Sequence, residues 1–101
     1  TVQFDHCLLN LSGFYKMNLK AFQFNNCSLQ EVDFTEADLS SAVFHECNLL
    51  GVMFDQTNLE KADLRTAINF SIDPENNKLK KAKFSMAGLI GLLHKYELTV
   101  S

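Results

Sequence analysis

The chain has 101 residues, of which 47% are hydrophobic, a single proline and a formal net charge of −3. This length and composition are typical of one folded, soluble domain, and no run of eighteen apolar residues predicts a transmembrane helix. An odd number of cysteines, three, argues against a framework of disulfides.

Large apolar residues recur at every fifth position from Phe4 to Leu64. A period of five fits neither an amphipathic helix, which repeats at 3.6, nor a strand, which repeats at 2. Fixed-period repetition predicts stacked units that bury a continuous core between them. We therefore expect the following residues to form the core: Phe4, Leu9, Phe14, Leu19, Phe24, Leu29, Phe34, Leu39, Phe44, Leu49, Phe54, Leu59 and Leu64.

A second series lies two residues before each of these positions, and most of its members are small, such as Ala37 and Ala62. One large and one small inward side chain per five residues suit the inside of a narrow tube with a polar wall. Met17 and Phe22 are exceptions, so we expect either local widening near them or one of the two turned outward.

The units A-D-L-S-S at 37–41 and A-D-L-R-T at 62–66 resemble the signature of the pentapeptide-repeat family. The match covers about residues 2–67 as an uninterrupted series of five-residue units. The resemblance implies an all-β solenoid, a right-handed quadrilateral β-helix of about three to four coils with four units in each coil.

A coil of twenty residues can be tested against the sequence, because positions twenty apart must then stack. Phenylalanines fill two opposite faces, one starting at Phe4 and one at Phe14, and leucines fill the other two. This alternation gives every layer two large and two medium side chains, as dense packing requires. Cys7, Cys27 and Cys47 also fall twenty apart, which predicts a column of buried, reduced thiols.

The pattern breaks at Ile68, so we divide the chain into a solenoid at 1–67, a surface loop at 68–78 and a final section at 79–101. Asp73–Asn77 has turn chemistry. The final section should hold a partial coil, a capping α-helix at about 86–96 with Ser85 as its N-cap, and a short terminal strand at 98–100.

The predicted helix is apolar nearly all round, so it must be buried on more than one side. Its simplest role is to cap the open end of the core. The ending also resembles that of bacterial pentapeptide-repeat proteins, some of which dimerise end to end, which implies a homodimer. The residues of this cap or dimer interface are Met86, Leu89, Ile90, Leu92, Leu93 and Tyr96.

The sequence opens on Thr1 already inside a coil, so we expect it to be a fragment of a longer chain. No signal peptide is visible. We expect a bacterial protein of the cytoplasm, where thiols stay reduced.

No catalytic constellation is found. His6 and His45 lie two coils apart, about 10 Å at the inter-strand spacing, too far to share a metal ion. The sequence has no phosphate-binding glycine loop, no G-x-S-x-G and no C-x-x-C. We predict no enzymatic activity, no catalytic residue, no metal and no cofactor.

The outer wall of the solenoid carries more acids than bases, which disfavours direct binding of nucleic acid. We expect no membrane association. The lysines at 78–83 have two interpretations, a solvated rim that keeps other strands from adding to the column, or a contact with a phosphate backbone. The candidate acidic interaction surface comprises Glu31, Asp33, Glu36, Asp38, Asp55, Glu60 and Asp63.

Two functions are compatible with these features. The first is a non-enzymatic rigid scaffold that binds another protein, favoured by a regular wall without a reactive site. The second follows from resemblance to the Qnr and mycobacterial fluoroquinolone-resistance branch of the family. It implies a DNA mimic that binds DNA gyrase or topoisomerase IV and protects it from fluoroquinolones. The acidic wall favours the second function, whereas its modest net charge and the lack of projecting loops favour the first.

Overall fold

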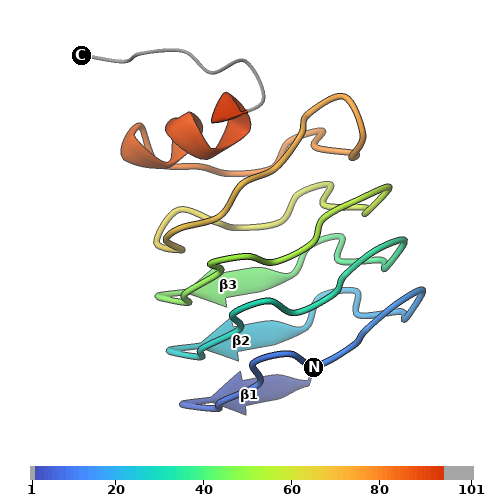
Figure 1. The fold of residues 1–101 in the computed structure, drawn as a ribbon, viewed down its shortest axis with the longest axis vertical. Coiled ribbons are helices and arrows are strands. Elements are labelled where there is room, and N and C mark those ends of the chain that lie inside the picture. The colour runs from blue at the N-terminus through green and yellow to red at the C-terminus, as the bar shows by residue number, and fades with distance from the viewer. Residues whose placement is uncertain (1, 95–101) are drawn as a thin grey trace.

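The computed structural model describes residues 2–94. The chain winds into a column of stacked coils with extents of 37 × 24 × 23 Å. Three short parallel strands lie above one another on one side of the column: β1 (Gln3–Asp5), β2 (Gln23–Asn25) and β3 (Val43–His45). The 3-10 helix η1 (Ala87–Leu92) lies at the opposite end of the column from β1 (Figure 1).

The coils repeat every twenty residues, as the sequence predicts. Phe4 pairs with Phe24 between β1 and β2, and Phe24 pairs with Phe44 between β2 and β3. Isolated parallel bridges repeat the same offset on the other sides of the column.

These bridges define four faces, each with one column of paired residues. Face one carries the strands and continues through Val43, Asp63 and Lys83. The other three columns are, for face two, Leu8, Ser28, Asn48 and Ile68; for face three, Gly13, Asp33 and Met53; and for face four, Asn18, Asp38, Asn58 and Lys78.

Two ladders of phenylalanine rings run through the core. On face one, Phe24 stacks 5.3 Å from Phe4 and 5.2 Å from Phe44, measured between ring centroids. On face three, Phe34 stacks 5.5 Å from Phe14 and 5.8 Å from Phe54. The ladders meet edge to face, with Phe34 6.3 Å from Phe24 and 6.0 Å from Phe44. Offset-stacked and edge-to-face geometries are the favoured arrangements of aromatic rings, so these contacts stabilise the core beyond the burial of apolar area.

The positions of the predicted core fall into two groups. Phe4, Leu9 and Phe14 are half-buried, because in the described residues their coil has a neighbour on one side only. The others are buried: Leu19, Phe24, Leu29, Phe34, Leu39, Phe44, Leu49, Phe54, Leu59 and Leu64.

Those small inward residues that carry a side-chain donor also satisfy backbone carbonyls. The Sγ atoms of Cys27 and Cys47 donate to the carbonyl oxygens of Phe4 and Phe24, each at 3.2 Å. Thr57 Oγ1 donates to the carbonyl of Phe34 at 2.9 Å in the same manner. A buried carbonyl without a partner is costly, so a small residue with a donor is favoured here. This explains the cysteine column without any reactivity.

Of the two oversized inward residues, one is turned outward. Met17 is 46% exposed. Phe22 packs against the core, with its ring 6.2 Å from Phe4 and 6.5 Å from Phe24. The column therefore accommodates one large extra side chain at this corner rather than two.

The segment 68–78 is more than the predicted surface loop. Asn69 takes a left-handed backbone conformation with φ 63° and is exposed, and the next residue, Phe70, turns into the core. Ile72 is buried as well. The five-residue period would place the next core position at 69, but Phe70 fills it instead, and the apolar axis continues through this segment.

The predicted α-helix is wrong, because the structure has the 3-10 helix η1 instead. The Ser85 hydroxyl accepts a hydrogen bond from the Gly88 N–H at 2.9 Å, but the N-cap of η1 is Met86, which makes no side-chain capping bond, rather than the predicted Ser85. The Gly91 carbonyl accepts from the Ile72 N–H at 2.8 Å, which ties η1 to the core. A Cβ on Gly91 would lie 2.5 Å from the Phe70 carbonyl oxygen, so this close contact requires glycine. Two glycines also weaken an α-helix. The terminal strand at 98–100 lies outside the described residues.

Candidate interaction surfaces

The structure divides the predicted acidic surface among all four faces. Asp33, Asp38 and Asp63 belong to three different bridge columns, on faces three, four and one. Glu31 follows face two at a corner with φ 59°. The seven acids therefore do not form one continuous surface.

Face three is the acidic face. Asp33, Glu36 and Asp55 lie on it, and the segment that follows above it adds Asp73 and Glu75, against Lys16 alone. Asp33 Oδ1 accepts from the Thr35 N–H at 2.9 Å, and Glu36 Oε2 accepts from the Tyr15 hydroxyl at 3.0 Å. These bonds fix the carboxylates on a rigid wall.

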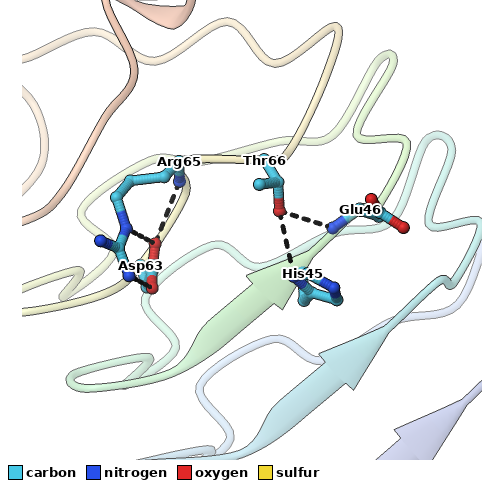
Figure 2. Close-up of polar contacts among 5 residues, drawn as sticks. All are labelled: His45, Glu46, Asp63, Arg65 and Thr66. Atoms are coloured by element: carbon cyan, nitrogen blue, oxygen red, sulfur yellow. Dashed lines mark hydrogen bonds and ion pairs between the residues drawn. The ribbon is translucent and has the colours of Figure 1, made fainter.

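Asp63 on face one is neutralised locally. Arg65 Nη2 lies 2.8 Å from Asp63 Oδ2, and Arg65 Nε donates to Asp63 Oδ1 at 3.0 Å (Figure 2). Hydrogen bonding from Arg65 lowers the pKa of Asp63, outweighing its partial burial. The carboxylate is ionised but already bound, so it contributes little to an acidic recognition surface.

The same face carries a polar contact between coils. Thr66 Oγ1 accepts from the Glu46 N–H at 2.8 Å and lies 3.3 Å from His45 Nδ1 (Figure 2). At the equivalent corner one coil earlier, the Asn26 N–H donates to the carbonyl of His45 instead. The Thr66 hydroxyl therefore replaces a backbone carbonyl, and His45 serves this structural contact.

Face four is basic. It carries five lysines and two carboxylates, Asp38 and Glu60. A shallow depression of about 520 Å³ lies on it, lined by Lys20, Asp38, Ser40, Ser41, Asn58, Glu60, Lys61, Lys80 and Lys81. Within residues 2–94, none of the lysines on this face forms an ion pair. Positive charge therefore remains available on this side of the column.

Asp38 keeps its charge on the basic face. Partial burial opposes ionisation, but hydrogen bonds from Ser40 and the charges of Lys20 and Lys78 outweigh it and lower the pKa of Asp38. Both the Ser40 N–H and the Ser40 hydroxyl donate to Asp38 Oδ1, at 3.0 and 2.7 Å. One of its two oxygens is therefore occupied by the protein.

The two buried thiols, those of Cys27 and Cys47, are poor nucleophiles. Burial raises the pKa of Cys47 to about 11, and burial also raises the pKa of Cys27. A thiolate is the reactive form, so both groups stay protonated near neutral pH. In the part of the chain that the structure describes, no group of three or more His, Cys, Asp or Glu residues could hold a metal ion.

The end of the column near η1 is apolar. Met86 is 86% exposed, and Leu89 and Ile90 are 40% and 46% exposed. Leu92 and Leu93 are half-buried. Tyr96, the last residue of the predicted interface, lies outside the described residues. Among residues 2–94, no helix has the length and apolar character needed to cross a membrane.

The basic face is hidden when the charges of the whole wall are summed, because the acids of the other faces outnumber its lysines. The twenty-residue register could have found it, since that register places Lys61 directly below Lys81. The same register separates Asp33 from Asp38. The charge of a face, rather than of the whole wall, is the relevant signal.

Residues 1–91 match the family described as the pentapeptide repeat region. No curated protein matches the sequence. Among solved structures, the chain is similar to the pentapeptide repeat protein Rfr23 from the cyanobacterium Cyanothece 51142, with 26% identity and a TM-score of 0.57 over 83% of this chain and 60% of Rfr23. The chain thus spans about three fifths of the length of that relative.

Two further structures are more distant. A trypsin-treated form of QnrB1, a plasmid-mediated fluoroquinolone resistance protein, shares 24% identity with a TM-score of 0.45, over 91% of this chain and 45% of QnrB1. A pentapeptide repeat protein from the Arabidopsis thaliana thylakoid lumen shares 22% identity with a TM-score of 0.39, over 80% of this chain and 57% of that protein. The match over most of the chain, together with the twenty-residue coils, establishes that this chain belongs to the pentapeptide repeat family.

Proposed function

We propose that this chain is a non-enzymatic, rigid scaffold that binds another protein through its outer faces. The observation that carries the proposal is the segregation of charge, with acids on face three and lysines on the adjacent face four. Charged patches of one sign steer association and select partners. The wall presents them at fixed positions, because successive coils are joined by backbone hydrogen bonds such as Leu39 N–H to Asn58 O at 2.7 Å.

The described side chains support binding better than catalysis. The buried thiols have raised pKa values, and His45 contacts Thr66. Recognition by a rigid surface loses little conformational entropy on binding, since the side chains are mounted on an ordered backbone.

The experiment is a reciprocal capture with the full chain and two matched surface variants. Asp33→Asn with Asp55→Asn neutralises face three, and Lys61→Gln with Lys81→Gln neutralises face four. A scaffold should capture a stoichiometric partner that one of these variants loses while it stays folded by circular dichroism. Equal capture by the wild type and both variants would contradict recognition through the charged faces.

A second candidate is binding to DNA gyrase or topoisomerase IV with protection from fluoroquinolones. The acidic face three, with Asp33, Glu36 and Asp55, favours it. The lysines of face four oppose mimicry of a duplex, which carries negative charge along both strands. A gyrase supercoiling assay with and without a fluoroquinolone separates the candidates. Relief of drug inhibition that is lost in the Asp33→Asn, Asp55→Asn variant would favour the topoisomerase function, and no effect would leave the scaffold.

We also propose that the apolar end around η1 forms a homodimer. Met86, Leu89 and Ile90 are exposed together there. Ile90→Asp should then give a monomer by light scattering with an unchanged circular dichroism spectrum, whereas an intact dimer would exclude Ile90 from the interface.

A further inference from the structure

We propose that the basic end of face four is a docking site for an acidic segment of a partner protein. The proposal rests on the scaffold function and names the chemistry of one partner. The site is centred on Lys61, Lys80 and Lys81, which line the depression on this face. Within the described range 2–94 these lysines have no ion-pair partner.

The backbone holds these lysines in a fixed array. The Lys61 N–H donates to the Lys80 carbonyl at 2.9 Å, and the Leu59 N–H donates to the Lys78 carbonyl at 2.8 Å. Lys61 and Lys81 occupy equivalent corners in successive coils, both with φ 62°. Their Cα atoms are therefore about 4.8 Å apart, the spacing of neighbouring strands. Two ammonium groups carried by neighbouring backbone positions repel each other, and an anionic partner would relieve that repulsion.

The depression also offers neutral polar groups. Ser41 and Asn58 lie in its lining beside the lysines, whereas the Ser40 hydroxyl there already donates to Asp38 Oδ1. Hydroxyl and amide groups can bond both the carboxylates and the backbone of a peptide. The partner that fits is a short extended strand with several Glu or Asp side chains.

The carboxylates of the same region disfavour a nucleic acid. Glu60 lies between the lysines in the lining of the depression, and Asp38 lies one coil further from η1. The adjacent face three adds Asp33, Glu36 and Asp55. A phosphate backbone that extended past Lys61 would meet Asp38 and the acids of face three as well as Glu60, whereas an acidic segment of a few residues would meet Glu60 alone.

The direct test is a fluorescence anisotropy titration of the full chain with a labelled peptide of about ten residues, alternately Glu and Gly, at about 20 mM and about 200 mM salt. A peptide with Gln in place of Glu is the control. The Glu peptide should bind, and its affinity should fall as the salt concentration rises, because exposed charges are screened. No binding of the Glu peptide at about 20 mM salt, or equal binding of the Gln peptide, would overturn the proposal.

Matched variants test the location. The double variant Lys61→Gln, Lys81→Gln should lower the affinity for the Glu peptide roughly 2- to 25-fold, because it removes two exposed charge pairs. Lys16→Gln, which lies on face three, should leave the affinity within about 2-fold. In the opposite direction, Glu60→Gln should strengthen binding roughly 1.5- to 5-fold, while Asp55→Asn changes the net charge equally but should have little effect. Equal effects of Lys16→Gln and Lys81→Gln would show that the attraction depends only on the net charge of the protein, and would overturn the proposed site.

A duplex and a single-stranded oligonucleotide of about the same charge are titrated in parallel. Tighter binding of either one, with the same dependence on Lys61 and Lys81, would overturn the acidic-segment proposal in favour of a phosphate backbone. The scaffold proposal has a separate readout, capture of a partner lost in the Asp33→Asn, Asp55→Asn variant, so it can stand when the peptide test fails.

Discussion

The regular coils at 2–67 and the closing segment at 68–94 bury the same axis by different means. In the regular coils, a large residue at every fifth position fills the core and backbone hydrogen bonds join neighbouring coils. In the closing segment, Phe70 and Ile72 fill the core at positions outside the five-residue period, and the buried side chain of Asn77 replaces several backbone partners at once.

Asn77 shows most clearly how a side chain replaces backbone hydrogen-bond partners. Its Oδ1 accepts from the Thr57 N–H at 2.9 Å, and its Nδ2 donates to the carbonyls of Phe54 and Asp73 at 3.1 and 2.9 Å. One buried amide thus satisfies three backbone groups where the regular ladder lapses. Regular coils derive stability from repetition, and the closing segment derives it from a few specific contacts.

The largest expected effect comes from the regular coils. Phe44 is fully buried and stacks on Phe24, so Phe44→Ala should lower the free energy of unfolding by about 3–5 kcal/mol. Phe84 lies in the same column but in the closing segment, is half-buried and is tilted 46° to Phe70. Phe84→Ala should therefore cost about half as much. Urea unfolding of both variants measures this, and equal losses would remove the contrast between the two regions.

The second prediction concerns Asn77. Asn77→Leu keeps the branched shape of the side chain but leaves buried backbone groups unsatisfied, so we expect a loss of about 2–3 kcal/mol. Asn76→Leu is the control, because Asn76 is exposed. Urea unfolding should separate the two variants, and a loss below about 1 kcal/mol for Asn77→Leu would mean that water or the loop itself replaces the amide.

The third prediction concerns the contact between η1 and Phe70. Gly91→Ala would place a Cβ 2.7 Å from two atoms of the Phe70 ring, so it should cost about 1–3 kcal/mol. Gly13→Ala has no atom within 4 Å of the new Cβ and should be near neutral. Thermal unfolding of both variants tests the contact. Equal melting temperatures would show that η1 shifts without loss.

Much of the fold follows from the sequence, because the registers of five and twenty are properties of the chain alone. Phe24 stacks between Phe4 and Phe44 as that register requires. The closing segment was harder to predict. At Asn69 the backbone is left-handed, with φ 63°, and the core position lies at Phe70. The conformation of a single residue cannot be recognised from the repeat pattern of the sequence.

The candidate surfaces were predicted only in part for a different reason. The acids were identified, but their assignment to one surface ignored the fact that Asp33 and Asp38 belong to different faces. The pairing of Asp63 with Arg65 could have been read from their spacing of two residues, which places both on the outer wall. The helix type depended on the packing of Gly91 on Phe70, a contact between segments that sequence patterns do not record.

The smallest expected effect concerns the thiol column inside the regular coils. Burial raises the pKa of Cys47 from 9.0 to about 11. The folded protein therefore holds this proton more tightly than the unfolded chain. The stabilisation is fully present below about pH 9 and declines between about pH 9 and 11, by at most ~1.4 kcal/mol per pH unit. Urea unfolding at about pH 8 and about pH 10 should show a loss for the wild type that exceeds the loss for Cys47→Ala by ~1 kcal/mol. Equal losses would mean that water or a neighbouring group solvates the Cys47 thiolate, so that this column of the regular coils is open to solvent.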